Sequence, residues 1–167
     1  MNSLNLKKIT FNLSIVILVF LLDRISKIYI LNFAEANGNV DIYLNSFTNL
    51  ILVWNTGIGF GLLSFEQSLI YNLITLLILI INLIIIYFII KTKDYRVYFF
   101  LIILGGSLGN LFDRVYYSAV PDFIDINYQG FHWFVFNIAD IFISLGIICL
   151  ITSELFLKKE SINKTNE

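Results

Sequence analysis

Long apolar stretches separated by shorter polar segments are the main pattern of this chain. Four stretches are long enough to cross a bilayer core of about 30 Å, which takes about 20 helical residues. They cover about residues 9–32, 67–90, 95–116 and 136–157. The pattern therefore predicts four transmembrane helices.

The two longer connections, about residues 33–66 and 117–135, differ from the apolar stretches in content. The first contains two short β-prone runs, 40–43 and 50–54, bounded by Gly and Asn. We expect them to form a small sheet on the membrane surface. The expected fold class is an all-α membrane protein with a small extracytoplasmic β-sheet, and residues 1–167 are expected to form a single integral membrane domain.

Lysine and arginine residues flank alternate ends of the four stretches. They lie near the N-terminus, between the second and third stretches and near the C-terminus, at Lys7, Lys8, Lys91, Lys93, Arg96, Lys158, Lys159 and Lys164. No Lys or Arg occurs between Lys27 and Lys91, or between Arg114 and Lys158. Because basic residues remain on the cytoplasmic side, we expect both termini in the cytoplasm and both long connections outside.

Composition supports a membrane protein and excludes several functions. Hydrophobic residues make up 58 % of the chain and the mean hydropathy is +0.83, more than a soluble domain of this size can bury. Acidic and basic residues nearly cancel, 12 against 11, so no electrostatic surface for nucleic acid is expected. One cysteine, Cys149, and one histidine, His132, cannot form a zinc site. We predict neither a metal nor a cofactor.

Charged residues inside the apolar stretches need an explanation, because each costs at least about 2.5 kcal/mol in the membrane. Asp23, Asp113 and Asp140 each lie about 22 to 27 Å along a helix from the cytoplasmic basic residues, given a rise of about 1.5 Å per residue. They therefore converge on one layer near the outer face. Asp122 follows Asp113 by nine residues and can return to that layer, so we expect the four acids to share one cavity.

Polar and small residues fall on one face of the third and fourth stretches. At steps of three and four residues the two faces carry Gly106, Gly109, Asn110, Asp113 and Arg114, and Asn137 and Asp140. We expect these faces to point at one another. A structural alternative is that the glycines permit close packing, while Asp23 with Lys27, and Asp113 with Arg114, form ion pairs.

Asp122 and Asp140 lie in the region between Arg114 and Lys158, which contains no Lys or Arg. Two carboxyl groups held close in a low dielectric share one proton. The ionised group can then deprotonate a water molecule while the protonated group polarises a peptide carbonyl. Further hydrogen-bond donors are available from Asn55, Asn110, Arg114 and Asn137. The pair predicts amide hydrolysis without a metal.

Five motifs follow one another in the order found in lipoprotein signal peptidases. They are residues 23–27 (DRISK), 55–60 (NTGIGF), 105–114 (GGSLGNLFDR), 120–123 (VPDF) and 136–140 (FNIAD). The chain resembles this family over nearly its whole length. The resemblance implies an intramembrane aspartic endopeptidase of the bacterial inner membrane. Its substrates would be diacylglyceryl-modified prolipoproteins, cut just before the lipidated cysteine.

The resemblance also implies roles for individual residues. Asp122 and Asp140 would be catalytic, and substrate-binding or supporting positions would be Asp23, Lys27, Asn55, Gly57, Asn110, Asp113, Arg114, Asn137 and Ala139. No cofactor is implied, and the expected partners are precursor signal peptides, membrane lipids and the inhibitor globomycin. We expect a monomer. The chain departs from the family pattern at Gly59, Ser118 and Pro121, which flank the acids.

Other functional classes compete with this interpretation. Residues 105–109 fit the G-x-S-x-G pattern of serine hydrolases, but within a membrane stretch rather than at a strand–helix corner. A small proton-coupled transporter or channel subunit would also contain buried acids. The acids here gather toward one face of the membrane and do not form a chain through its midplane. A purely structural assembly factor would tolerate Asp122→Asn and Asp140→Asn.

Overall fold

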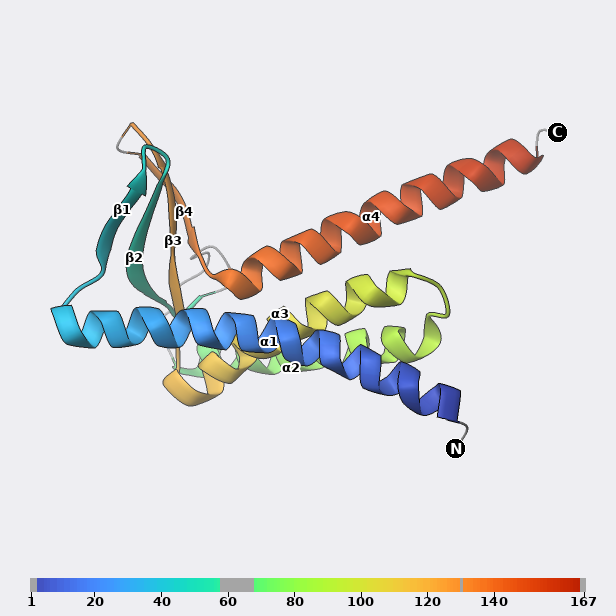
Figure 1. The fold of residues 1–167 in the computed structure, drawn as a ribbon, viewed down its shortest axis with the longest axis horizontal. Helices are drawn as coiled ribbons and strands as arrows, with labels where there is room; N and C mark the ends of the chain where they lie inside the picture. The colour runs from blue at the N-terminus through green and yellow to red at the C-terminus, as the bar shows by residue number, and fades with distance from the viewer. Residues whose placement is uncertain (1–2, 58–67, 130, 166–167) are drawn as a thin grey trace.

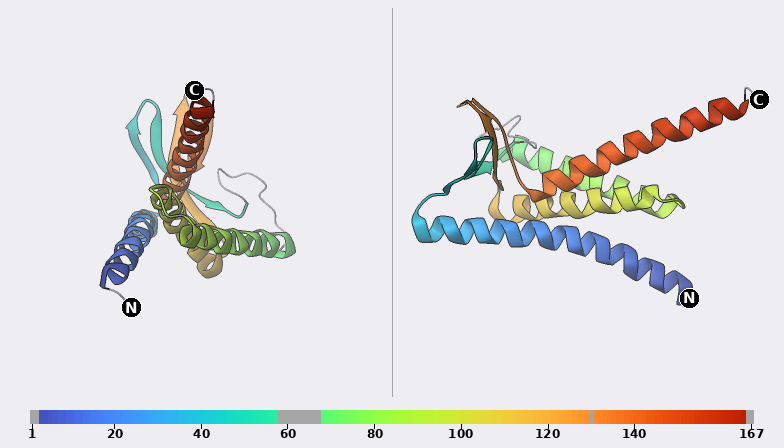
Figure 2. Two further views of the ribbon diagram at one scale, coloured as in Figure 1. Left: turned by 90° about the vertical axis from the view of Figure 1, so that its right-hand side faces the viewer. Right: turned by 45° about the horizontal axis from the view of Figure 1, so that its top comes forward.

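Within residues 3–57, 68–129 and 131–165, which the computed structural model describes, the chain forms four helices and four strands. The helices are α1 (Ser3–Asn37), α2 (Ser68–Lys91), α3 (Arg96–Tyr117) and α4 (Ile138–Thr165). They correspond to the four predicted apolar stretches. α1 and α2 each lie alongside α3, and α4 diverges from the other helices toward the C-terminus (Figures 1 and 2).

Three of the helices are long and apolar enough to cross a membrane. They are Leu69–Lys91, Arg96–Tyr117 and Ile138–Phe156. The predicted span at 9–32 lies within α1, which is not one of these three. A transmembrane position for α1 therefore stays a prediction.

A four-stranded antiparallel sheet stands across one end of the helices (Figure 1). Its strands, in the order β1-β2-β3-β4, are β1 (Asp41–Asn45), β2 (Thr48–Asn55), β3 (Val120–Tyr128) and β4 (Phe131–Phe136). The sequence predicts strands in the first connection alone, whereas the second connection supplies half of the sheet. The all-α description is therefore too narrow, and α4 begins at Ile138 because Phe136 still belongs to β4.

The sheet brings two distant segments of the chain together. β2 pairs with β3 from Thr48↔Ile126 to Asn55↔Val120, with a register shift between Leu50 and Val53. This pairing places the end of β2 beside the start of β3. The start of α1 and the end of α4 lie at the opposite end of the helices from the sheet, as Figures 1 and 2 show.

Helix α3 contacts each of the other three helices. Glycines allow this close approach, because a Cβ atom on Gly106 would lie 2.7 Å from the backbone oxygen of Ala139 in α4. A Cβ atom on Gly109 would collide with the carboxylate of Asp23 in α1. Small residues at helix contacts are typical of membrane bundles. Here they bring α1 and α4 against the polar face of α3.

In the part of the chain that the structure describes, buried apolar residues form two clusters. Ile85, Ile103 and Leu104 join α2 to α3, and a second cluster under the sheet contains Phe123 of β3. Most large apolar side chains of the helices are instead exposed, including Leu73 of α2. Lipid would cover these side chains, since apolar residues on the outside of a helix bundle favour a hydrocarbon environment.

Two of the three family departures have a clear structural setting. Ser118 ends α3 with φ 58° and ψ 19°, a left-handed conformation that glycine adopts at lower cost. Pro121 lies in β3 before Ile124, where the pairing with β4 begins. The missing N–H of Pro121 therefore costs no hydrogen bond to β4. Gly59 lies outside the described residues.

Candidate active site

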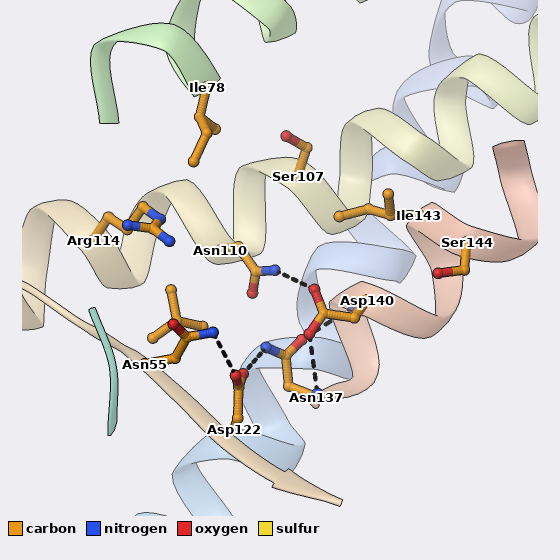
Figure 3. Close-up of a pocket in the computed structure, with 11 residues that line it drawn as sticks. Asn55, Ile78, Ser107, Asn110, Arg114, Asp122, Asn137, Asp140, Ile143 and Ser144 are labelled. Atoms are coloured by element: carbon orange, nitrogen blue, oxygen red, sulfur yellow. Dashed lines mark hydrogen bonds between the residues drawn. The ribbon is translucent and has the colours of Figure 1, made fainter. Parts of the chain in front are cut away.

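Asp122 and Asp140 lie at one cavity between the sheet and the helices (Figure 3). Asp122 comes from β3 and is 1 % exposed, and Asp140 comes from the first turn of α4 and is 7 % exposed. The cavity has a volume of about 230 Å³. Its walls carry Asn55, Ile78, Ser107, Asn110, Arg114, Val120, Asp122, Asn137, Asp140, Ile143 and Ser144. Acids, amides, two serine hydroxyl groups and a guanidinium group thus share this enclosure with the apolar side chains of Ile78, Val120 and Ile143.

Asn137 connects the two acids. Its side-chain Nδ2 donates to Asp122 Oδ1 at 2.6 Å, and its backbone N–H donates to Asp140 Oδ2 at 3.2 Å. The Asp140 N–H donates in turn to Asn137 Oδ1 at 3.1 Å. Asn137 and Asp140 therefore make a reciprocal cap at the N-terminus of α4, with the acid three residues after the capping residue. The cap that starts the helix also aims Asp140 into the cavity.

Asp122 accepts a hydrogen bond at each carboxylate oxygen. Besides Asn137, Asn55 Nδ2 donates to Asp122 Oδ2 at 2.8 Å, and the Gly57 N–H donates to Asn55 Oδ1 at 2.8 Å. The pKa of Asp122 is nevertheless raised from 3.8 to about 7, first by burial and second by the negative charge of Asp140. A carboxyl group that titrates near neutrality is suited to acid–base catalysis at physiological pH.

A buried ion cluster supports the cavity from the side of α1. Lys27 Nζ lies 2.9 Å from Asp23 Oδ2, 2.6 Å from Asp113 Oδ2 and 2.8 Å from Asn110 Oδ1. Arg24 Nη2 forms a second ion pair with Asp113 Oδ1 at 2.5 Å. Asn110 Nδ2 donates to Asp140 Oδ1 at 2.9 Å, a bond drawn in Figure 3. The cluster is thus linked directly to the candidate acid pair.

Arg114 lines the cavity from α3 and fixes the segment after β2. Its Nη2 donates to the backbone oxygen of Gly57. The Tyr71 hydroxyl of α2 donates to the Arg114 carbonyl oxygen at 2.9 Å, and the Tyr71 ring lies 5.4 Å from the guanidinium carbon. Among the described residues, Arg114 Nη1 has no hydrogen-bond partner although it is buried. This donor remains available to a molecule in the cavity.

The structure gathers all eleven predicted site residues at this end of the helices, but the expectation that four acids share one cavity is wrong. Asp122 and Asp140 line the cavity, while Asp23 and Asp113 lie behind it, paired with Lys27. Of the two predicted ion pairs, the Asp23–Lys27 pair is present, and the described partners of Asp113 are basic residues of α1. Charges that cannot reach water pair across helices, because an unpaired buried charge is costly.

Ala139 and Arg24 both contact Asp23, but only Ala139 is among the residues expected at the site from the sequence. Ala139 was expected at the site, and its backbone N–H donates to Asp23 Oδ1 at 3.1 Å. Arg24 was not singled out, although its position next to Asp23 is a signal for an ion pair. The apolar wall formed by Ile78 and Ile143 was also missed. Isolated isoleucines in an apolar helix carry no distinguishing sequence signal.

The serine hydrolase alternative finds no support in the geometry. Ser107 lines the cavity, but His132 lies in β4 and its Nδ1 is 2.7 Å from Asp125 Oδ2. Within the part of the chain that the structure describes, no group of three His, Cys, Asp or Glu residues could hold a metal ion. The cavity therefore offers two acids with neutral and cationic hydrogen-bond donors as its reactive groups.

Comparisons with known proteins point to one family. The model of the signal peptidase (SPase) II family matches residues 15–156. The lipoprotein signal peptidase of Pelagibacter ubique is 52 % identical, over 99 % of this chain and 100 % of that protein. The lipoprotein signal peptidase of Anaplasma phagocytophilum is 39 % identical, over 87 % and 91 %.

Solved structures resemble the fold as well. A bacterial membrane enzyme studied by the in meso method superposes with a TM-score of 0.73 at 28 % identity, covering 93 % of this chain and 92 % of that one. A second such enzyme superposes with a TM-score of 0.69 at 27 % identity, covering 88 % and 94 %.

Proposed function

The chain belongs to the signal peptidase II family, and on this premise we propose that Asp122 and Asp140 are the catalytic pair of an aspartic-type endopeptidase. The protein is thus a membrane protease of lipoprotein processing, and the family assignment favours this function over a proton-coupled transporter. The bridge that Asn137 makes between the two acids is the observation that carries the catalytic proposal.

The reaction uses one proton held by the pair. The ionised acid takes a proton from a water molecule, whose oxygen attacks the carbonyl carbon of the scissile peptide bond. The protonated acid hydrogen-bonds to the carbonyl oxygen and stabilises the charge that develops there. The apolar wall that includes Ile78 and Ile143 limits bulk water around these steps, which strengthens each electrostatic interaction.

The substrate is the membrane-anchored precursor of a lipoprotein. We propose that the signal peptide is removed just before a cysteine that carries a diacylglyceryl group. Such a precursor is held in the membrane by its signal helix and its acyl chains, so it meets the cavity by diffusion within the bilayer. The buried Nη1 of Arg114, which has no hydrogen-bond partner among the described residues, is a suitable donor to a substrate backbone carbonyl.

We propose a topology in which α1 is a fourth span and both termini are cytoplasmic, in a single membrane domain of the bacterial inner membrane. The sheet then lies on the outer side, and the cavity opens at the level of the outer leaflet. This arrangement is supported by the basic residues near both termini and by the sheet at the opposite end of the helices. We further propose that the protein acts as a monomer and binds globomycin at the same cavity.

A cleavage assay tests the catalytic proposal. A lipidated precursor is incubated with purified protein, and the shift in its gel mobility is followed with and without globomycin. Asp122→Asn and Asp140→Asn are each expected to abolish cleavage while the protein remains folded. Asp41→Asn, which changes an exposed acid of β1, is the matched control and should leave cleavage intact. Cleavage that survives both cavity substitutions would overturn the proposal.

A further inference from the structure

Lys27 determines which way the side-chain amide of Asn110 points. Lys27 is fully buried, and its ammonium group meets three acceptors, on Asp23, Asn110 and Asp113. An ammonium group has three N–H donors and no acceptor, so the Asn110 atom that faces it must be oxygen. The amide nitrogen of Asn110 must then face Asp140 Oδ1, which has to accept the hydrogen bond.

The second oxygen of Asp140 is constrained in the same way. Asp140 Oδ2 accepts from the backbone N–H of Asn137, a group that can only donate. Asp140 also lies in the first turn of α4, where the partial positive charge of the helix N-terminus favours a negative side chain. Each hydrogen bond that Asp140 accepts, and its place at the helix N-terminus, therefore favour its ionised form.

Asp122 has no helix N-terminus to stabilise its negative charge. It belongs to a strand, whose dipole is small, and its two donors are the neutral amides of Asn55 and Asn137. The charged groups around Asp140 include Asp122 from β3 and Lys27 and Asp23 from α1, and α3 contributes Arg114 at the cavity and Asp113, which is paired with Lys27. When one proton is divided between the two acids, the helix N-terminus, which acts on Asp140 and not on Asp122, places the proton on Asp122.

We propose that Lys27 is a positioning residue that acts through Asn110 to keep Asp140 ionised, which leaves the shared proton on Asp122. This inference rests on the proposed function of the pair. It assigns the two chemical roles: Asp140 is the base that activates water, and Asp122 is the acid that serves the carbonyl oxygen.

The assignment gives a balanced reaction. Water transfers a proton to Asp140 as its oxygen bonds to the carbonyl carbon, and Asp122 gives its proton to the carbonyl oxygen, forming a neutral diol. Asp140 then protonates the leaving amine as the C–N bond breaks, and Asp122 takes one proton back from the diol. The pair ends in its starting state without any other reactant.

The pH dependence of cleavage tests the role of Lys27. In Lys27→Met, Asn110 is free to turn its oxygen toward Asp140, and a nearby positive charge is lost, so Asp140 should bind a proton more readily. We expect kcat per folded molecule to fall about tenfold or more with KM changed less than about twofold, because only a transition-state interaction is removed. The acid limb of the kcat/KM profile should move to higher pH.

Two further variants separate positioning from a structural role. Lys27→Arg keeps a group that can only donate and should restore the pH profile toward that of the unchanged protein. Ser14→Ala, on an exposed part of α1, should change neither rate nor profile. The proposal would be overturned by a folded Lys27→Met protein whose kcat and whose kcat/KM–pH profile are both unchanged.

Removing Lys27 alone leaves excess negative charge in the cluster and can prevent folding. The double variant Lys27→Met/Asp113→Asn leaves Arg24 to balance Asp23, so the cluster stays neutral. If this double variant folds like the unchanged protein, the acid limb of its kcat/KM profile should move to higher pH, as in Lys27→Met. An unshifted limb in this folded variant would count against the proposal.

Infrared difference spectroscopy gives a readout that needs no substrate. At pH 6 the carbonyl stretch of a neutral carboxyl group should be lost in Asp122→Asn, because the remaining Asp140 is ionised. If that band persists, the proton was on Asp140 and the proposal fails, even if both acids are essential. If instead neither acid is needed for cleavage, the proposed function fails, whatever the spectrum shows.

Discussion

Asn137 Nδ2 donates to Asp122 Oδ1 across 2.6 Å, a bond between a helix-capping residue and an acid that lies on a strand. The amide cannot turn around, because its oxygen accepts from the Asp140 N–H. The start of α4 and the orientation of Asp122 are therefore set by one side chain. This coupling explains why an asparagine, with a donor at one atom and an acceptor at the other, suits this position.

Asn137→Asp should separate the two tasks of this residue. Aspartate caps a helix as well as asparagine does, so the stability of α4 should be kept. The substitution replaces the amide donor to Asp122 by an acceptor, and a buried group that loses its hydrogen-bond partner costs about 1–3 kcal/mol. We expect kcat to fall at least about tenfold with α4 still formed, and the unfolding temperature to fall as well, because a carboxylate is then buried beside two acids.

The control for this experiment is Asn45→Asp. Asn45 is an exposed residue of β1 whose Oδ1 accepts from the Phe47 N–H, a bond that aspartate can also accept. This variant should cleave precursor at the normal rate. A normal kcat in Asn137→Asp would contradict the role assigned to Asn137.

Cleavage should decline on the alkaline side of neutrality. The pKa of Asp122 is raised to about 7, so the shared proton is lost as the pH rises through that value. We expect kcat/KM to fall about tenfold per pH unit well above pH 7, since one proton must be retained. A profile measured from pH 5 to 9 that stays flat above pH 7 would contradict this expectation.

The raised pKa of Asp122 should also make the stability of the folded protein depend on pH. The carboxyl pKa of Asp122 is higher in the folded protein, about 7, than the ordinary value of 3.8, so between these pH values the folded state binds more protons than the unfolded state. The contribution of Asp122 to the free energy of unfolding therefore falls as the pH rises through this window. Asp122→Asn should remove this dependence, measured as the difference in unfolding temperature between pH 5 and pH 8.

Gly106→Ala should force α3 and α4 apart. The new methyl group would lie 2.7 Å from the Ala139 backbone oxygen, which has no rotamer by which to move away. Overpacking of this kind costs about 1–3 kcal/mol. We expect a lower unfolding temperature in detergent and slower cleavage, because Ala139 lies next to Asp140. Ile148→Ala, on an exposed face of α4, should change stability by less than about 0.5 kcal/mol.

Ser118→Gly should stabilise the protein. Ser118 holds a left-handed backbone conformation at the end of α3, which costs a residue with a Cβ atom about 1 kcal/mol. Glycine removes this cost but gains freedom in the unfolded chain, so we expect a net increase of about 0.5 kcal/mol in the free energy of unfolding. Thermal unfolding should show it, and a decrease in unfolding temperature would mean that the serine side chain stabilises the turn.

Much of this protein could be predicted from its sequence. Apolar stretches of sufficient length predict the helices, because a local hydrophobic pattern is enough to define a membrane helix. The absence of basic residues between Arg114 and Lys158 drew attention to Asp122 and Asp140. The polar face of α3 was visible as residues spaced three and four apart, a periodicity that needs no knowledge of neighbouring helices.

The tertiary structure decided what local patterns do not encode. β3 and β4 form because the two connections meet, and Asn55 reaches Asp122 across 67 residues of sequence. Lys27 and Asp113 are separated by 86 residues, so nothing near either one reveals their pairing. The sequence determined which chemical groups are present and near which end of the helices they lie. Which two acids line the cavity and which two lie behind it depends on long-range packing and on the need to pair every buried charge.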